Sequence, residues 1–170
     1  MPAITSGARL PLLTVPVNIM LARAVDVVWL TLPYDNLQTF NVLTSDQQGG
    51  WLMSDAAAAM AAALSRRKYR RLTVLGHSLG TVGVAHLMSL VAGALESEAI
   101  WFSPICRNLL VREGLQRTAA QSLIVVGTAD DEYDPAFIDV LIANAAQIVV
   151  VPDANAYMEV TGAAVLSRRP

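Results

Sequence analysis

Cysteine, histidine and charge are scarce in this chain of 170 residues. Cys106 is the only cysteine, so the chain has no disulfide framework and no cysteine-based metal site, and a reducing cytoplasm is the expected compartment. The charged fraction of 15% and the formal charge of −2 give no basic surface for nucleic acid. No apolar run reaches the ~18 residues of a membrane span. These absences exclude nucleic-acid and membrane partners.

Nucleotide cofactor motifs are also missing. No G-x-G-x-x-G follows the first apolar run, and the segment 76–80 lacks the Lys-Ser/Thr ending of a phosphate loop. We therefore expect no cofactor and no metal. Residues 10–21 resemble the apolar part of a signal peptide, but Pro11, Pro16 and Asn18 interrupt them, so export is the less favoured interpretation.

The high apolar content, 54% of residues, predicts a sheet that is buried on both faces. Short β-branched runs alternate with helical patterns, as in a parallel sheet with helices on both faces. The length suits a single domain over residues 1–170. We expect strands at residues 25–32, 72–75, 99–102, 122–126 and 147–151, and helices at residues 10–23, 51–67, 78–91 and 135–145.

A G-x-S-x-G pentapeptide, Gly76-His77-Ser78-Leu79-Gly80, lies between an expected strand and an expected helix. This is the sequence context of a nucleophile elbow, in which a strained turn exposes a serine hydroxyl. Side chains in place of the flanking glycines are expected to collide in so sharp a turn. The helix that begins there directs free N–H groups at the same point, and Leu79 N–H is a candidate oxyanion donor.

An acidic loop follows the expected strand at 122–126. Hydrolases keep the carboxylate that orients their histidine in a loop after a late strand, and the spacing from Gly127 favours Asp130. Asp134 before Pro135 has the pattern of a helix N-cap instead. Asp131 and Glu132 are expected to be solvated.

Together these motifs resemble the small bacterial α/β-hydrolases that lack a lid domain. The resemblance covers most of the chain, through LPYDN, GHSLGTVGVAHL, IWFSPI, VVGTADDEYDP and VVPDANAYMEV. It implies a minimal α/β-hydrolase fold with a sheet of about six strands, including a short one at residues 2–4. It also implies a serine esterase or thioesterase-like activity on a small acyl substrate, with Ser78 and Asp130 in a catalytic triad. The second oxyanion donor would be Gly7 or Ala8, and a homodimer is left open.

The histidine of that triad is missing. Relatives read A-x-H-x-L-E in the last loop, where this chain has Ala154-Asn155-Ala156-Tyr157-Met158-Glu159, so the resemblance places Ala156 at the histidine position. The chain has two histidines. His77 directly precedes Ser78, so its side chain is expected to point away from the serine, and His86 is expected about 12 Å along the following helix. Neither is a good candidate for the missing base.

A serine without an adjacent base is a weak nucleophile, so we expect an inactive or strongly impaired hydrolase. Three explanations are open: Ala156 is an engineered change, it is a natural loss, or a partner chain supplies the base. We favour an engineered change because Ser78 and Asp130 persist. The alternative is a non-catalytic ligand-binding or regulatory pseudo-hydrolase.

Overall fold

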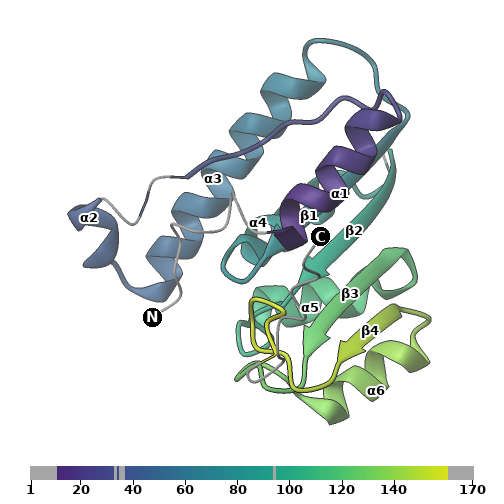
Figure 1. Ribbon diagram of the computed structural model, residues 1–170. Coiled ribbons are helices and arrows are strands. Elements are labelled where there is room, and N and C mark those ends of the chain that lie inside the picture. Colours follow the sequence, from purple (N-terminus) through teal and green to yellow (C-terminus); the bar gives the residue numbers. More distant parts are fainter. Residues whose placement is uncertain (1–10, 33, 35–36, 94, 161–170) are drawn as a thin grey trace, which may run out of the picture.

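Four parallel strands form the sheet in this computed structural model, which describes residues 11–32, 34, 37–93 and 95–160. In sheet order they are β1 (Arg71–His77), β2 (Glu96–Phe102), β3 (Ser122–Gly127) and β4 (Gln147–Val151). All three pairings are parallel (Figure 1). The expected class, α/β with a parallel sheet flanked by helices, is confirmed. The expected count of about six strands is wrong for the described residues.

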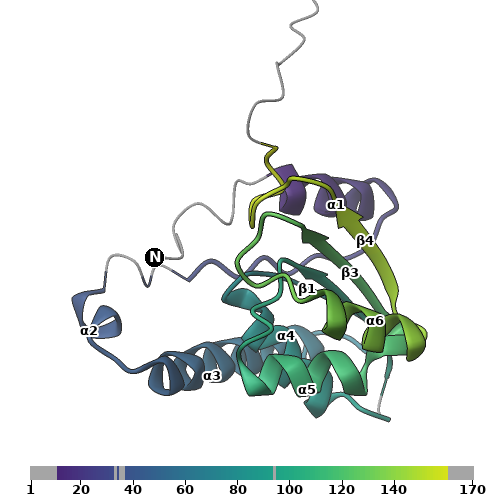
Figure 2. The same ribbon diagram turned by 90° about the horizontal axis from the view of Figure 1, so that it is seen from below.

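Helices connect the strands and cover both faces of the sheet. They are α1 (Pro11–Ala22), α2 (Gln38–Asn41), α3 (Ser45–Leu64), α4 (Gly80–Leu90), α5 (Leu109–Arg117) and α6 (Pro135–Ala143), with a short 3₁₀ turn at Ala119–Gln121. Because successive strands are neighbours and crossovers are right-handed, α4, α5 and α6 fall on one face, and α1 lies on the other (Figure 2). None of the helices in the described part of the chain is long and apolar enough to cross a membrane.

The segment at residues 25–32, which we expected to be a strand, is extended but pairs with no strand. Its apolar side chains are largely exposed, with Val28 at 62% and Val25 at 47%. Together with residues of α3, it lines a cavity of about 980 Å³. The predicted buried strand is therefore wrong for these residues, because strand formation also needs a hydrogen-bonding partner and no described residue supplies one.

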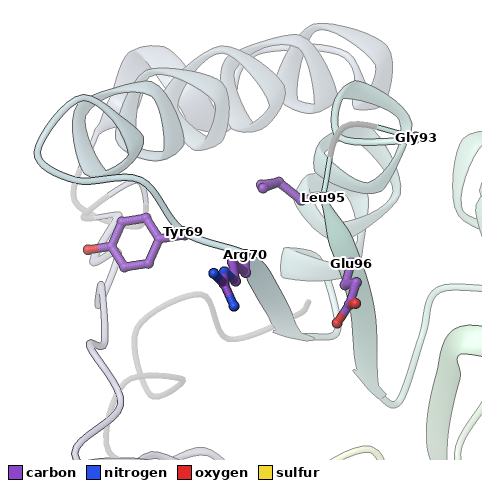
Figure 3. Close-up of a pocket in the computed structure, with 5 residues that line it drawn as sticks. All are labelled: Tyr69, Arg70, Gly93, Leu95 and Glu96. Carbon is purple, nitrogen blue, oxygen red and sulfur yellow. The ribbon is translucent and has the colours of Figure 1, made fainter.

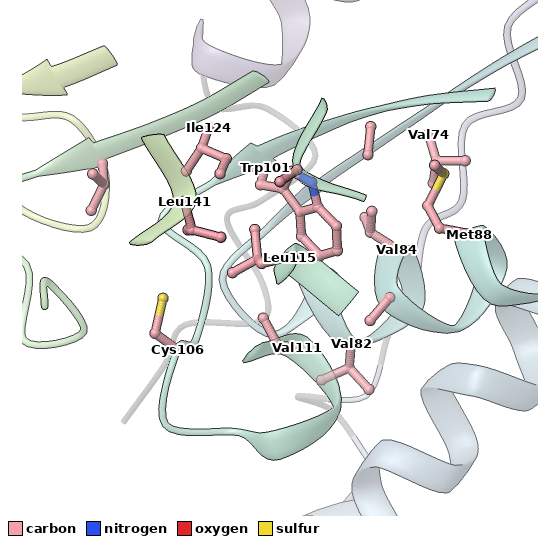
Figure 4. Close-up of a cluster of buried hydrophobic side chains, with 14 of the residues drawn as sticks. Val74, Val82, Val84, Met88, Trp101, Cys106, Val111, Leu115, Ile124 and Leu141 are labelled. Carbon is pink, nitrogen blue, oxygen red and sulfur yellow. The ribbon is translucent and has the colours of Figure 1, made fainter. Parts of the chain in front are cut away.

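The core lies mainly between the sheet and helices α4, α5 and α6 (Figure 4). Trp101 of β2 is fully buried at its centre, and its indole N–H donates to the Ser122 hydroxyl at 2.9 Å. The helices approach closely because α5 carries Gly114, where a Cβ would lie 2.9 Å from the Ala85 Cβ. Helix α4 also packs against β1, where the Cβ position of Gly76 lies 2.5 Å from Val84 Cγ2, and the turn between β1 and α4 carries Ser78.

Candidate active site

The carboxyl ends of the four strands meet at one edge of the sheet, as they must when strands are parallel. Ser78 follows β1 directly, Ser103 follows β2, and Asp130 lies three residues after β3. The loop of residues 152–160 follows β4. The sequence-predicted residues Ser78, Asp130 and Ala156 are therefore all in segments that leave this edge.

Ser78 occupies a sharp turn between β1 and α4. Its φ of +50° is a left-handed conformation that residues with a side chain rarely adopt. Hydrogen bonds hold that turn: Ser78 N–H donates to the Phe102 carbonyl at 3.0 Å, and the Ser78 carbonyl accepts from Thr81 N–H at 2.9 Å and from the Thr81 hydroxyl at 2.6 Å. The half-buried serine lines a cavity of about 980 Å³.

The two glycines of the pentapeptide differ in their packing. A Cβ on Gly76 would lie 2.5 Å from Val84 Cγ2 and 2.8 Å from the Gly80 carbonyl oxygen, so no side chain fits there. A Cβ on Gly80 would meet nothing within 4 Å. The expected collision is therefore found at the first glycine and is wrong for the second.

An oxyanion donor is available at the start of α4. Leu79 immediately precedes the helix and has helical φ and ψ of −55° and −30°. Leu79 N–H makes no hydrogen bond within the described residues. This free N–H and the positive end of the α4 dipole are suited to stabilise negative charge beside Ser78. The other two candidate donors, Gly7 and Ala8, lie outside the described residues.

Asp130 is buried, with 8% of its surface exposed. One carboxylate oxygen, Oδ1, accepts from the Glu132 backbone N–H at 3.0 Å. The other, Oδ2, is buried and has no hydrogen-bond partner among the described residues. A buried carboxylate oxygen without a donor is costly, because its lost hydration is not replaced by a hydrogen bond.

The neighbouring acidic residues have other roles. Asp134 caps α6 as its position before Pro135 predicts, accepting from Phe137 N–H at 3.1 Å. Glu132, expected to be solvated, is half-buried and accepts from Arg107 N–H at 2.9 Å. Asp131 is exposed. Asp130 is therefore the one buried carboxylate of this loop.

The loop that contains Ala156 bridges the ends of β1 and β3. At the β3 end, Ala129 N–H donates to the Ala154 carbonyl at 2.9 Å, and the approach is so close that a Cβ on Gly127 would lie 2.0 Å from that oxygen. At the β1 end, the Ala156 carbonyl oxygen lies 2.8 Å from His77 Nε2. The loop thus runs from beside Asp130 to beside the elbow of Ser78.

His77 is engaged by this loop and is a poor base for Ser78. Burial lowers the pKa of His77, although the contact with the Ala156 carbonyl and the negative charge of Asp130 partly oppose that effect. If His77 is neutral, a hydrogen bond to a carbonyl requires the proton on Nε2, which leaves that nitrogen unable to accept one. His86 lies within α4, two turns beyond Ser78.

Two further nucleophile candidates are sequestered. Ser103, which sequence reasoning did not single out, is 2% exposed, has a φ of +44°, and donates its hydroxyl to the Ala156 carbonyl at 2.8 Å. The only sequence feature that could have identified Ser103 is its position directly after a predicted strand. Burial raises the pKa of the Cys106 thiol to about 12, so this thiol stays protonated at neutral pH.

A second cavity lies at the opposite edge of the sheet, where β1 and β2 begin. Its volume is about 570 Å³, and Figure 3 shows the residues that line it: Tyr69, Arg70, Gly93, Leu95 and Glu96. Glu96 also pairs with Arg71 at 3.3 Å. Among the described residues that line this cavity there is no serine, histidine or cysteine.

Comparisons of the chain with family profiles, curated proteins and solved structures found no match.

Proposed function

We propose that this chain is a serine hydrolase scaffold for ester or related acyl compounds whose catalytic histidine position is occupied by Ala156. The observation that carries the proposal is the left-handed conformation of Ser78 on a strand–turn–helix junction beside a cavity. Such strain costs about 1–3 kcal/mol and is retained where it serves a site. The unpartnered Oδ2 of Asp130 supports it, because a triad aspartate accepts a hydrogen bond from its histidine at such an oxygen.

In the proposed reaction, Ser78 Oγ attacks the acyl carbonyl carbon and its proton passes to a histidine base. The carbonyl oxygen becomes an oxyanion, which Leu79 N–H and the start of α4 stabilise. Collapse of the tetrahedral intermediate expels the alcohol or thiol, which takes the proton from the histidine. Water then releases the acid from the acyl-serine by the same steps.

With alanine at position 156 the proton of Ser78 has no acceptor. Loss of the histidine from a serine-protease triad lowers kcat by roughly 10⁶, or about 8 kcal/mol of transition-state stabilisation. The oxyanion donor and the cavity persist and can still bind an acyl compound. We therefore propose that the chain as given binds such compounds and hydrolyses them very slowly.

The test is Ala156→His, assayed with p-nitrophenyl acetate and butyrate. We expect hydrolysis to rise by at least about 10³-fold, because the new imidazole would accept the Ser78 proton and donate to Asp130 Oδ2. Tyr157→His, one position along the same loop, is the matched control and should stay inactive.

Two outcomes would count against this assignment. One is an unchanged rate in Ala156→His, and the other is a raised rate that survives Ser78→Ala. If the rate is unchanged while small acyl ligands still raise the melting temperature, the chain is a non-catalytic binding domain.

A further inference from the structure

The carbonyl oxygen of Ala156 accepts two side-chain hydrogen bonds, one from the end of each of two neighbouring strands. His77, the last residue of β1, has its Nε2 2.8 Å from this oxygen. Ser103, the first residue after β2, donates its hydroxyl to the same oxygen at 2.8 Å. A carbonyl oxygen has two lone pairs, so the two donors use its whole capacity as an acceptor. They hold the backbone of position 156 against the ends of β1 and β2.

The two bonds belong to a closed ring that includes the turn of the nucleophile. Ser78 N–H donates to the Phe102 carbonyl at 3.0 Å. Phe102 is joined covalently to Ser103, and His77 is joined covalently to Ser78. The ring therefore leads from Ser78 to the Ala156 carbonyl by two separate routes, one through β2 and one through His77. Both routes fix the place of residue 156 relative to the backbone of the serine.

The loop of residues 152–160 is also held to β3, but that connection places it relative to a different group. Ala129 N–H, just beyond β3, donates to the Ala154 carbonyl at 2.9 Å. Asp130 is the next residue of the same segment, so this bond sets the position of the loop relative to the Asp130 carboxylate. Among the described residues, only the Ala156 carbonyl links the loop by hydrogen bonds to the ends of β1 and β2.

The conformation of Ser103 indicates that its bond is specific. The residue is 2% exposed, so its hydroxyl reaches neither solvent nor a substrate. Its φ of +44° lies in the left-handed region, which favours glycine over residues with a side chain. A serine stands there nevertheless, and within the described part of the chain the Ala156 carbonyl is the one partner of its hydroxyl.

His77 contacts the same part of the loop in two ways. Besides the bond to the Ala156 carbonyl, its ring lies against that of Tyr157, with the two centroids 5.7 Å apart and the rings tilted by 45°. A neutral imidazole has one N–H, and the bond to a carbonyl uses it. The histidine inside the pentapeptide therefore has a use that does not require it to act as a base.

We propose that His77 and Ser103 are positioning residues that fix the backbone of position 156 relative to Ser78. The proposal rests on the proposed function, in which position 156 is the place of the base. A base must lie within hydrogen-bond reach of the serine hydroxyl, and a displacement of about 1 Å can lower the rate by roughly 100-fold. The bond at β3 sets the distance of the loop from Asp130, and the two bonds at the Ala156 carbonyl set its distance from Ser78.

Kinetics in the Ala156→His background test the role of Ser103. Ser103→Ala should lower kcat by about 10- to 100-fold and leave KM within about twofold, because a misplaced imidazole impairs proton transfer and not binding. Ser103→Gly should lower kcat equally but destabilise the fold less, since glycine suits the left-handed conformation.

Ser122→Ala is the matched control. Ser122 is a buried serine whose hydroxyl also donates to a backbone carbonyl, at 2.8 Å, but it lies at the start of β3, away from the carboxyl ends of the strands. Its loss should lower stability and leave kcat unchanged.

His77 is tested by comparing a variant that loses the donor with one that retains it. In the same background, His77→Leu fills similar space without a ring nitrogen and should lower kcat as Ser103→Ala does. His77→Gln retains an N–H donor and should recover most of that loss. Such a recovery assigns the effect to the hydrogen bond, because leucine also occupies the site.

A spectroscopic measurement on the chain as given separates the two bonds from the hydrolase function. Each donor polarises the Ala156 carbonyl and moves its carbon-13 resonance downfield. Ser103→Ala and His77→Leu should therefore each move that resonance upfield, and Ser122→Ala should not. If these shifts are found while Ala156→His is inactive, the hydrolase function fails and the fixed place of residue 156 stands.

Three results would overturn the proposal. The first is an Ala156 carbonyl resonance that neither Ser103→Ala nor His77→Leu moves. The second is an active Ala156→His chain in which Ser103→Ala leaves kcat unchanged. The third is a kcat that Ser103→Gly restores together with stability, because the loss in Ser103→Ala would then come from destabilisation alone.

Discussion

The glycines on either side of Ser78 show how differently two identical residues of one motif are constrained. Gly76 lies against Val84 Cγ2 and the Gly80 carbonyl, whereas the Cβ position of Gly80 is open. We predict that Gly76→Ala lowers the free energy of unfolding by about 1–3 kcal/mol through overpacking. Gly80→Ala should raise it by up to about 1 kcal/mol, since alanine favours the helix that begins there. Urea denaturation of both variants is the measurement, and equal effects would contradict the packing argument.

His77 gives the fold a dependence on pH near neutrality. Burial lowers its pKa from the ordinary 6.5, so between the folded pKa and 6.5 the unfolded chain binds more protons than the folded one. Stability that is fully present above pH 6.5 is therefore lost as the pH falls through the folded pKa. The hydrogen bond from Phe137 N–H lowers the pKa of Asp134. Its contribution to stability is therefore lost only as the pH falls below the ordinary carboxyl pKa of 3.8, outside the range considered for His77.

We predict that the urea concentration at the unfolding midpoint decreases as the pH is lowered from 7.5 to 5, and that this decrease is smaller in His77→Gln. Glutamine can keep a donor near the Ala156 carbonyl while removing the titration. The prediction fails if His77→Gln and the unsubstituted chain have the same pH profile.

At the scale of helices and strands, the pattern of apolar residues located most elements within a few residues. β4 has the predicted bounds, and β1 is longer than predicted at both ends. The segment 25–32 was predicted wrongly because its apolar run is a property of that segment alone. Whether a neighbouring strand pairs with it cannot be read from the run. α5 was missed because it has only nine residues and Gly114 interrupts its apolar pattern; the close approach to α4, which requires that glycine, is invisible in the sequence.

For the molecule as a whole, the parallel topology brings loops from distant parts of the chain to one edge. Sequence reasoning could place Ser78 and Asp130 after their strands, because that requires only the local motif. It could not show that the Ala156 carbonyl contacts both His77 and Ser103, since these contacts span 79 and 53 residues. Whether Ala156 faces Asp130 as a triad histidine would is therefore best measured as a coupling between the two positions.

A double-mutant cycle measures that coupling without an activity assay. In the chain as given, Asp130→Asn should raise the free energy of unfolding by about 1 kcal/mol, because it replaces a charged group that has an unpartnered buried oxygen with a neutral one. In the Ala156→His background the imidazole would donate to Oδ2, so the same change should be neutral or destabilising. We expect a coupling of at least about 1 kcal/mol, the range found for residues in contact. The exposed Asp131→Asn should show none, and additivity at Asp130 would mean that position 156 does not face this carboxylate.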